Sequence, residues 1–432
     1  MNRNFIFLDK SLESNLSSTI FEIANYIIVK DSQKSLNVLF YSDILLFIAE
    51  FLPTVKEQNK WIGLGYRICR QIKDSLENYG HQYRTAMLGG LGFQCFAINV
   101  FSQEANMLNN FSKSIHKVLL YTIDKKLRAL SSASLHDSDY DLVCGISGSL
   151  YYLLDFDYTK EEKQILAKCA EYLVSLASDT EFDGKPITKF HILQPNQNPN
   201  FDQGDYKDGN INFGLAHGML GPLIALAKAY SKGICVNGME DAIQKIYNLY
   251  ECFQVKNEFD ISYWPALITV DEYWNKRCKQ EHIETTASWC YGNIGIMRGL
   301  QKVARYMNWT DRELVLVNAM SRFFEQEIDT YELRSPSLCH GFSSLIAVQT
   351  CAYNTYKNPK LLINLERNVQ RLLRQYRKSN SQEINLMDII TKKNLTEGYL
   401  KDLSLMTGSI GIAITLLSFK KDVQSWRLLM ID

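Results

Sequence analysis

Residues 290–300 read CYGNIGIMRGL, a short turn that contains a glycine and leads into apolar residues at helical spacing. The same arrangement recurs five more times around the core Gly-x-x-Gly, with Ser344 in place of the second glycine in one copy. The other copies are LGGLGFQCFA (88–97), CGISGSLYYLL (144–154), HGMLGPLIALA (217–227), CHGFSSLIAV (339–348) and TGSIGIAITLL (407–417). A degenerate seventh copy, FYSDILLFIAEF, occupies 40–51. The chain therefore contains an internal repeat, and repeats of this length are typical of stacked supersecondary units.

The segments between the copies carry apolar residues three and four positions apart, as in 162–177 and 362–376, and the whole chain has only 8 prolines in 432 residues. This period predicts amphipathic helices, so we expect an all-α fold. Each interval has room for one apolar, glycine-led helix and a second, more polar helix. Seven such hairpins can stack and close with the apolar helices inside. Closure would direct several helix N-termini at one spot and favour anions there.

Two intervals are longer than the others and predict departures from this pattern. Residues 176–212 are rich in Pro, Asn, Asp and Gly and contain the short alternating run ITKFHIL, which indicates an inserted, β-containing extension. Residues 259–274 are a second candidate for strand or irregular structure. We expect one domain over 1–432 that carries 176–212 as the inserted extension. In copies without polar residues, such as 88–97, the glycines are best explained by close helix packing alone.

The composition excludes several classes of protein. The 47 basic and 47 acidic residues cancel, which argues against a general nucleic-acid-binding surface. The most apolar stretch, 38–52, is interrupted by Asp43 and Glu50, and the first residues lack an apolar signal-peptide region, so we expect neither a membrane span nor export. A cytoplasmic protein with ten reduced cysteines follows from these observations.

Three copies carry metal-ligating residues one or two positions before the glycine. Cys290 lies in SWCYG, Cys339 and His340 are adjacent in SLCHG, and His217 lies in AHG. A lone cysteine is more often a small buried apolar residue, but equivalent positions of a repeat meet at the same end of a closed bundle. Two thiols and one imidazole suit zinc, and three protein ligands leave a fourth position open, as in catalytic sites. The sequence predicts one zinc ion held by Cys290, Cys339 and His340.

Three further residues are candidates for chemistry. His217 is interpreted as a general acid or base, although a fourth metal ligand and a structural histidine are the alternatives. Asp141, four residues before a repeat glycine, is expected to orient His217 or contact the substrate, with a capping role as the alternative. Tyr291 is a candidate donor to a developing oxyanion, and core packing is its alternative role. Cys144 also precedes a glycine, but its apolar neighbours favour packing.

The glycine repeats, together with AHG, WCYG and CHG in this order, resemble the lanthionine synthetase C-like family. The resemblance covers the chain from about residue 40 to 412. It implies an α/α-toroid of seven inner and seven outer helices with one zinc ion, whose ligands map onto Cys290, Cys339 and His340. The active-site histidine and aspartate of the family map onto His217 and Asp141. Members commonly carry an arginine four residues before the WCYG cysteine, whereas this chain has Thr286.

The resemblance implies a zinc-dependent cyclase that adds peptide cysteine thiolates to dehydroalanine or dehydrobutyrine and forms thioether rings. The implied substrate is a dehydrated precursor peptide, and the extension at 176–212 is a candidate site for its leader segment. A dehydratase and an ABC transporter are the implied partners, and contact with them would place the protein at the inner face of the membrane. Three alternatives remain: addition of glutathione to dehydrated residues, a prenyltransferase-like zinc enzyme, and a non-catalytic scaffold stabilised by zinc.

Overall fold

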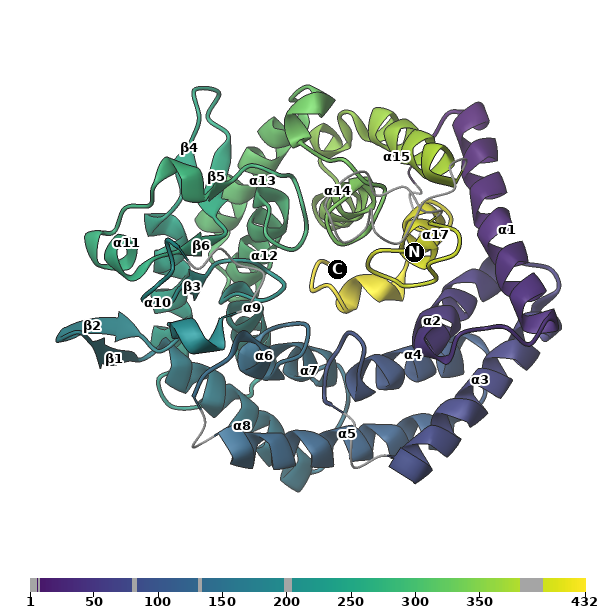
Figure 1. Ribbon diagram of the computed structural model, residues 1–432, viewed down its shortest axis with the longest axis horizontal. Coiled ribbons are helices and arrows are strands. Elements are labelled where there is room, and N and C mark those ends of the chain that lie inside the picture. Colours follow the sequence, from purple (N-terminus) through teal and green to yellow (C-terminus); the bar gives the residue numbers. More distant parts are fainter. Residues whose placement is uncertain (1–5, 7, 80–83, 131–133, 198–203, 381–398) are drawn as a thin grey trace. The chain divides into compact units, whose positions relative to one another are not determined.

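The computed structural model describes the whole chain except residues 1–5, 7, 80–83, 131–133, 198–203 and 381–398. Two sets of seven helices alternate along it (Figure 1). The glycine-led set, which matches the seven repeat copies, is α2 (Tyr41–Phe51), α4 (Leu91–Glu104), α7 (Ile146–Leu153), α9 (Leu220–Ser231), α12 (Asn293–Tyr306), α14 (Phe342–Tyr356) and α17 (Ser409–Leu417). The more polar set is α1 (Lys10–Ser32), α3 (Gln58–Tyr79), α5 (Asn109–Leu130), α8 (Lys160–Ala177), α10 (Met239–Cys252), α13 (Thr310–Phe324) and α15 (Leu365–Asn380).

The two sets differ in burial as their sequences predict. In α12, every residue from Asn293 to Ala304 is buried, whereas α10 buries only one face. Buried helices need apolar or paired side chains all round, while amphipathic helices keep one polar face in water. Short 3₁₀ helices connect the longer elements: η1 (Val38–Phe40), η2 (Leu52–Thr54), η4 (Gln194–Asn196), η5 (Gln280–His282), η6 (Ile328–Tyr331), η7 (Pro359–Leu362) and η8 (Gln424–Arg427).

The chain divides into two compact units. Unit 1 comprises residues 1–82, 94–112 and 324–426, and unit 2 comprises residues 83–93, 113–323 and 427–432. In unit 1, α17 packs against α1, α2 and α14, while α15 packs against α14. In unit 2, α9 lies between α7 and α12, and the polar helices α8 and α10 pack against α9. Glycine-led helices thus pack on each other in both units.

Backbone hydrogen bonds join the turns that precede neighbouring glycine-led helices. The carbonyl of Cys290, before α12, accepts the N–H groups of Leu215 and Ala216, before α9, at 2.8 and 3.2 Å. Equivalent bonds join the turns before α4 and α7, α7 and α9, and α14 and α17. Their acceptors are the carbonyls of Val143, Ala216 and Met406. These bonds fix the repeat turns side by side without using any side chain.

The repeat glycines are required by the turns themselves. A Cβ on Gly292 would lie 2.1 Å from the carbonyl oxygen of Thr286, and one on Gly295 would lie 2.0 Å from that of Trp289. No side chain fits at these distances, so only glycine lets the chain fold back tightly before the helix. In the first copy this position is held by Gly90, which faces the Arg84 carbonyl, and not by Gly89.

Both long intervals contribute strands to unit 2. Strands β1 (Asp179–Phe182) and β2 (Lys185–Thr188) form an antiparallel hairpin. Strand β3 (Ile211–Asn212) pairs with β6 (Leu267–Ile268), and β4 (Val255–Lys256), β5 (Ser262–Pro265) and β7 (Ile283–Glu284) form a three-stranded sheet. The segment 259–274 also contains helix α11 (Val270–Asn275). The β-containing extension is therefore assembled from residues 176–212, of which 198–203 lie outside the described residues, and from 255–284.

Within the described residues, no helix has both the length and the apolar character needed to cross a bilayer.

Candidate functional site

His217 and Asp141 come together in unit 2. His217 lies in the turn before α9, and Asp141 ends the short helix α6 (Asp137–Tyr140). The imidazole Nδ1 of His217 lies 2.6 Å from Oδ2 of Asp141. The Asp141 side chain is 1% exposed, whereas that of His217 is 35% exposed. Oδ1 of Asp141 accepts the N–H groups of Cys144 and Gly145, both at 2.6 Å, so this one carboxylate caps the next helix and holds the imidazole.

The surroundings of His217 favour its protonated form. Burial by itself lowers the pKa of His217, but the hydrogen bond and charge of Asp141, followed by the charges of Asp137 and Cys290, raise that pKa above its ordinary value. A carboxylate at Nδ1 keeps the proton on that nitrogen, which leaves Nε2 to exchange a proton with another group. Asp141 therefore fixes the orientation of His217 and favours the form of the imidazole that can donate a proton.

Asp137 is a member of this site that the sequence analysis missed. Its carbonyl accepts the N–H of Asp141 at 3.0 Å, which places the two aspartates one helical turn apart. Burial raises the pKa of Asp137, the charge of Asp141 raises it further, and His217 opposes the shift. The spacing of four residues in HDSDYD, which sets two carboxylates on one side of a turn, was the available signal.

Tyr291 lies beside His217, with 6.4 Å between the ring centroids. Its hydroxyl accepts a hydrogen bond from the amide Nδ2 of Asn212 at 3.4 Å, and burial raises the pKa of Tyr291, so the phenol stays protonated. A Cβ on Gly214 would lie 2.6 Å from the Tyr291 ring, and the Gly214 N–H donates to Oδ1 of Asn212. Glycine at 214 therefore makes room for the tyrosine.

Cys290 occupies the same turn as Tyr291 and is 9% exposed. Its Sγ lies 3.7 Å from the hydroxyl of Ser288, and that hydroxyl accepts the N–H of Gly292 at 3.0 Å. Thr286 belongs to the same turn, and its carbonyl accepts the N–H of Ser288 at 2.8 Å. The cysteine is thus held in a turn whose polar groups are paired.

Cys339 and His340 lie in the turn before α14 and are partly buried and exposed, respectively. The candidate ligand atoms of Cys290, Cys339 and His340 all lie within 4.8 Å of one another. Across the described ranges, no other group of three His, Cys, Asp or Glu residues has this arrangement, and His217 is not a member of it. A cluster of two thiols and one imidazole fits zinc, for which these are the usual ligands.

Cys144 also precedes a repeat glycine, but it lies outside the cluster of candidate ligands. Burial, with the charge of Asp141 in addition, raises the pKa of Cys144 to about 11. Its thiol therefore stays protonated, in keeping with the packing role expected for it.

The family model described as Lanthionine synthetase C-like protein matches residues 43–431. The chain belongs to the lanthionine synthetase C-like family. Nisin biosynthesis protein NisC from Lactococcus lactis subsp. lactis is 26% identical to it over 315 residues, which are 71% of either chain. The solved structure of nisin cyclase matches with a TM-score of 0.77 and 20% identity, over 94% of this chain and 96% of that one. This likeness confirms the predicted fold class of this family member, an all-α toroid with a small β-containing extension.

Proposed function

We propose that this chain is a zinc-dependent lanthipeptide cyclase. It joins cysteine thiols of a dehydrated precursor peptide to dehydroalanine or dehydrobutyrine and forms lanthionine or methyllanthionine rings. The observation that carries the proposal is the cluster of Cys290, Cys339 and His340, accompanied in the turn before α9 by the paired His217. Membership of the family and the names of the relatives, a nisin biosynthesis protein and a nisin cyclase, support the same reaction.

The reaction needs one deprotonation and one protonation. The peptide S–H bond breaks, its sulfur forms a bond with the β-carbon of the dehydrated residue, and the electron pair of the double bond moves toward the adjoining carbonyl. The α-carbon then takes up a proton, so no atom is gained or lost. A zinc ion held by Cys290, Cys339 and His340 would supply the positive charge that lowers the pKa of the peptide thiol.

The chain's own residues handle the proton and the developing negative charge. Asp141, bonded to Nδ1, raises the pKa of His217 above its ordinary value and so favours the protonated imidazole. Its Nε2–H is therefore the donor that we assign to the α-carbon. Tyr291 retains its phenolic proton and lies beside His217, so its O–H is assigned to the enolate oxygen. A donor placed where charge develops stabilises the transition state more than the ground state.

The extension supplies a surface for the leader segment of the precursor. A groove of about 760 Å³ lies between the β1–β2 hairpin, α10 and α11. Its apolar lining includes Pro186, Leu249, Tyr273 and Trp274. In the described part of the chain, β1 pairs with β2 alone, so its other edge is available to an added strand. We assign the leader segment to this edge and groove.

The test is a thiol count on a dehydrated peptide incubated with the zinc-loaded chain. Two peptides serve as probes: the dehydrated nisin precursor and a short synthetic peptide with one dehydroalanine and one cysteine. We expect alkylatable thiol to disappear without a change in peptide mass, because cyclisation is an isomerisation. Wild-type chain and the Cys290→Ala variant are compared in the same assay.

Three other outcomes would contradict the proposal. Added glutathione that becomes attached to the peptide, with the peptide thiol intact, indicates intermolecular addition. Unchanged thiol in both peptides at an equimolar amount of zinc-loaded chain indicates a binding scaffold. Thiol loss that is as fast with Cys290→Ala as with wild type removes the metal cluster from the reaction.

A further inference from the structure

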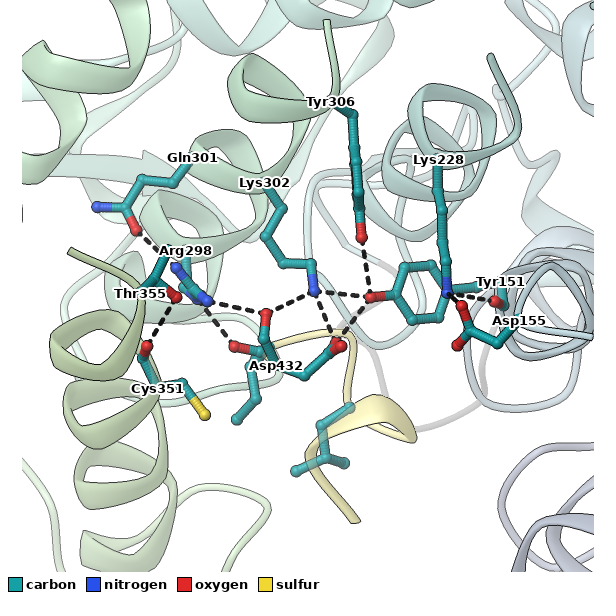
Figure 2. Close-up of polar contacts among 12 residues, drawn as sticks. Tyr151, Asp155, Lys228, Arg298, Gln301, Lys302, Tyr306, Cys351, Thr355 and Asp432 are labelled. Carbon is teal, nitrogen blue, oxygen red and sulfur yellow. Dashed lines mark hydrogen bonds and ion pairs between the residues drawn. The ribbon is translucent and has the colours of Figure 1, made fainter. Parts of the chain in front are cut away.

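Residues Leu428–Asp432, here called the strap, run along α12 within unit 2. Leu428, Leu429, Met430 and Ile431 are 2, 1, 1 and 0% exposed, so these four residues belong to the core, whereas the side chain of Asp432 is 33% exposed. Figure 2 shows Asp432 at the centre of a row of polar side chains from α7, α9 and α12. None of these residues takes part in the chemistry assigned above. Arg298 and Lys302 are buried, and burying charges is costly, so their bonds to the strap need a reason.

The first anchor of the strap is next to a metal ligand. Nε1–H of Trp289 donates to the carbonyl of Leu429 at 2.9 Å. Trp289 is 1% exposed and directly precedes Cys290. The position of the indole and the path of the backbone at Cys290 are therefore set together by this bond.

The second anchor lies further along α12. Arg298 donates through Nε to the carbonyl of Ile431 at 2.8 Å and through Nη2 to that of Asp432 at 2.9 Å. Nζ of Lys302 lies 2.6 Å from Oδ1 of Asp432 and 2.8 Å from its carbonyl oxygen. The hydroxyl of Tyr151 donates to the same Oδ1 at 2.7 Å (Figure 2). Each donor of this anchor is itself buried.

The backbone between the two anchors is strained. Met430 has φ of +53°, in the left-handed region that residues with a side chain rarely adopt. Such a conformation persists only where the surroundings determine it from both sides. Leu429 is fixed on one side of Met430, and Ile431 and Asp432 are fixed on the other.

We propose that the strap is a positioning device that holds Trp289, and through it the ligand Cys290, with the Lys302–Asp432 ion pair as its latch. The inference rests on the proposed role of Cys290 in metal binding. In this ion pair the Lys302 side chain is buried while that of Asp432 is 33% exposed, and such a pair is weak support for stability alone. Here the ion pair has a geometric role. It fixes Asp432 at one end of the strap, while Leu429, nearer the other end, is bonded to Trp289, the residue before Cys290. Groups that support a ligand from behind typically change metal affinity about 10–100-fold when they are removed.

Lys228 provides a matched control. It is as buried as Lys302, lies over the same Tyr151 ring with Nζ 3.8 Å from the centroid, and pairs with Asp155 at 2.8 Å. Its bonds go to Asp155 and to the carbonyl of Tyr151, and not to the strap. Lys228→Met therefore removes a buried cation while it leaves both anchors in place.

The experiment compares Asp432→Asn, Lys302→Met and Lys228→Met in the full chain. The probes are Co²⁺, whose thiolate absorption reports the ligand geometry, and Zn²⁺, whose affinity is measured by competition with a chelator. We expect Asp432→Asn and Lys302→Met to weaken Zn²⁺ binding about 10-fold and to shift the Co²⁺ spectrum. Lys228→Met should lower the thermal midpoint but leave both metal readouts at wild-type values.

A double-mutant cycle with Trp289→Phe tests whether the Lys302–Asp432 ion pair acts on Cys290 through Trp289. The phenylalanine keeps an aromatic ring but removes the N–H that bonds to Leu429. If the strap links the two anchors, the losses of Zn²⁺ affinity from Trp289→Phe and Asp432→Asn are less than additive in the double variant. Trp289→Phe keeps the latch, so it tests the inference even if Asp432→Asn does not fold.

The outcomes separate this inference from the proposed function. Wild-type chain that binds Co²⁺ without thiolate absorption contradicts the metal site and the proposed function with it. Wild-type chain with a normal spectrum, combined with unchanged Zn²⁺ affinity in Asp432→Asn and Trp289→Phe, overturns the strap alone. Equal losses in Lys228→Met and Lys302→Met, or strictly additive losses in the cycle, also overturn it and reduce the ion pair to a stabilising role.

Discussion

His217 and Asp141 are 76 residues apart in the chain, yet Nδ1 of the first lies 2.6 Å from Oδ2 of the second. The repeat produces this contact, because both residues precede glycine-led helices whose turns are bonded together. Asp141 is buried and also accepts two backbone N–H groups, so its carboxylate is fixed before any substrate binds. A fixed acceptor sets both the direction of the imidazole and its affinity for a proton.

Asp141→Asn should therefore shift the pH dependence of the reaction. The donor form of His217 is lost as pH rises through its pKa, and Asp141 raises that pKa above the ordinary value of about 6.5. Asparagine can keep the acceptor for Cys144 and Gly145 but removes the charge. We expect the alkaline limb of the thiol-loss rate to move to lower pH. Asp139→Asn, on the same short helix, serves as the control, and an identical limb in both variants would remove the assigned role of Asp141.

His217→Asn should slow ring formation without releasing zinc. The imidazole is not one of the three clustered ligands, so the metal content should stay at one ion per chain. Loss of a general acid typically costs about 10²–10⁴-fold in rate. Zinc content and the rate of thiol loss are measured on the same sample. Retained zinc with an unchanged rate would identify a bystander histidine, and lost zinc would identify a fourth ligand.

Cys290→Ala or Cys339→Ala should abolish stoichiometric zinc, because each removes one of the three clustered candidate ligands. Elemental analysis of purified protein is the measurement. Cys144→Ala is the matched control: its thiol lies in a repeat turn but outside the cluster, and zinc should remain. Full occupancy in Cys290→Ala would refute the ligand assignment.

The glycine repeat allowed the helices to be predicted because it reflects a local requirement. In the six copies that contain glycine, the turn before the buried helix leaves no room for a Cβ, so the sequence records the turn there. In the first copy the spacing Gly-x-x-Gly indicates Gly89 and Gly92, whereas the close contact with the Arg84 carbonyl is made by Gly90. The ligand residues followed from the same repeat positions.

Features that depend on contacts distant in sequence were not predictable. Strands β3 and β6 are two residues each, too short for an alternating pattern to show their pairing. The anchor between Arg298 and Ile431 joins residues 133 positions apart, and nothing local marks either of them. Asp137 could be predicted only in part. Its spacing from Asp141 can be read from the sequence, whereas its interaction with His217 depends on the fold.

Removal of the β1–β2 hairpin should separate leader binding from catalysis. The N–H of Lys189 donates to the carbonyl of Ser178 at 3.0 Å, so the two ends of the hairpin are adjacent and a short Gly-Ser turn can replace residues 179–188. We expect weaker binding of a leader peptide, measured by fluorescence anisotropy, with zinc content unchanged. An equally short replacement of the 257–260 turn between β4 and β5 is the control. Unchanged leader affinity in the hairpin variant would exclude the proposed edge and groove.

Asp43, in the degenerate seventh copy, should make stability depend on pH near neutrality. Its side chain is buried in α2, and Oδ1 accepts the N–H of Leu405 at 2.6 Å. Burial raises the pKa of Asp43 to about 7, the Leu405 bond opposes the rise, and the charge of Asp402 adds to it. Between about pH 4 and 7 the native chain therefore holds a proton that the unfolded chain has lost.

The sign of the effect follows from this proton. Because the native state binds more protons in that range, the free energy of unfolding falls as pH rises from about 4 to 7 and then levels off. Asp43→Asn keeps an oxygen for Leu405 and cannot ionise, so it should flatten this slope and stabilise the chain at pH 8 by on the order of 1 kcal/mol or more. Urea unfolding of both proteins at pH 5 and pH 8 measures the difference. If the free energy of unfolding falls by the same amount in both proteins between pH 5 and pH 8, another group causes the pH dependence of stability, because the variant has no carboxyl at position 43 to titrate.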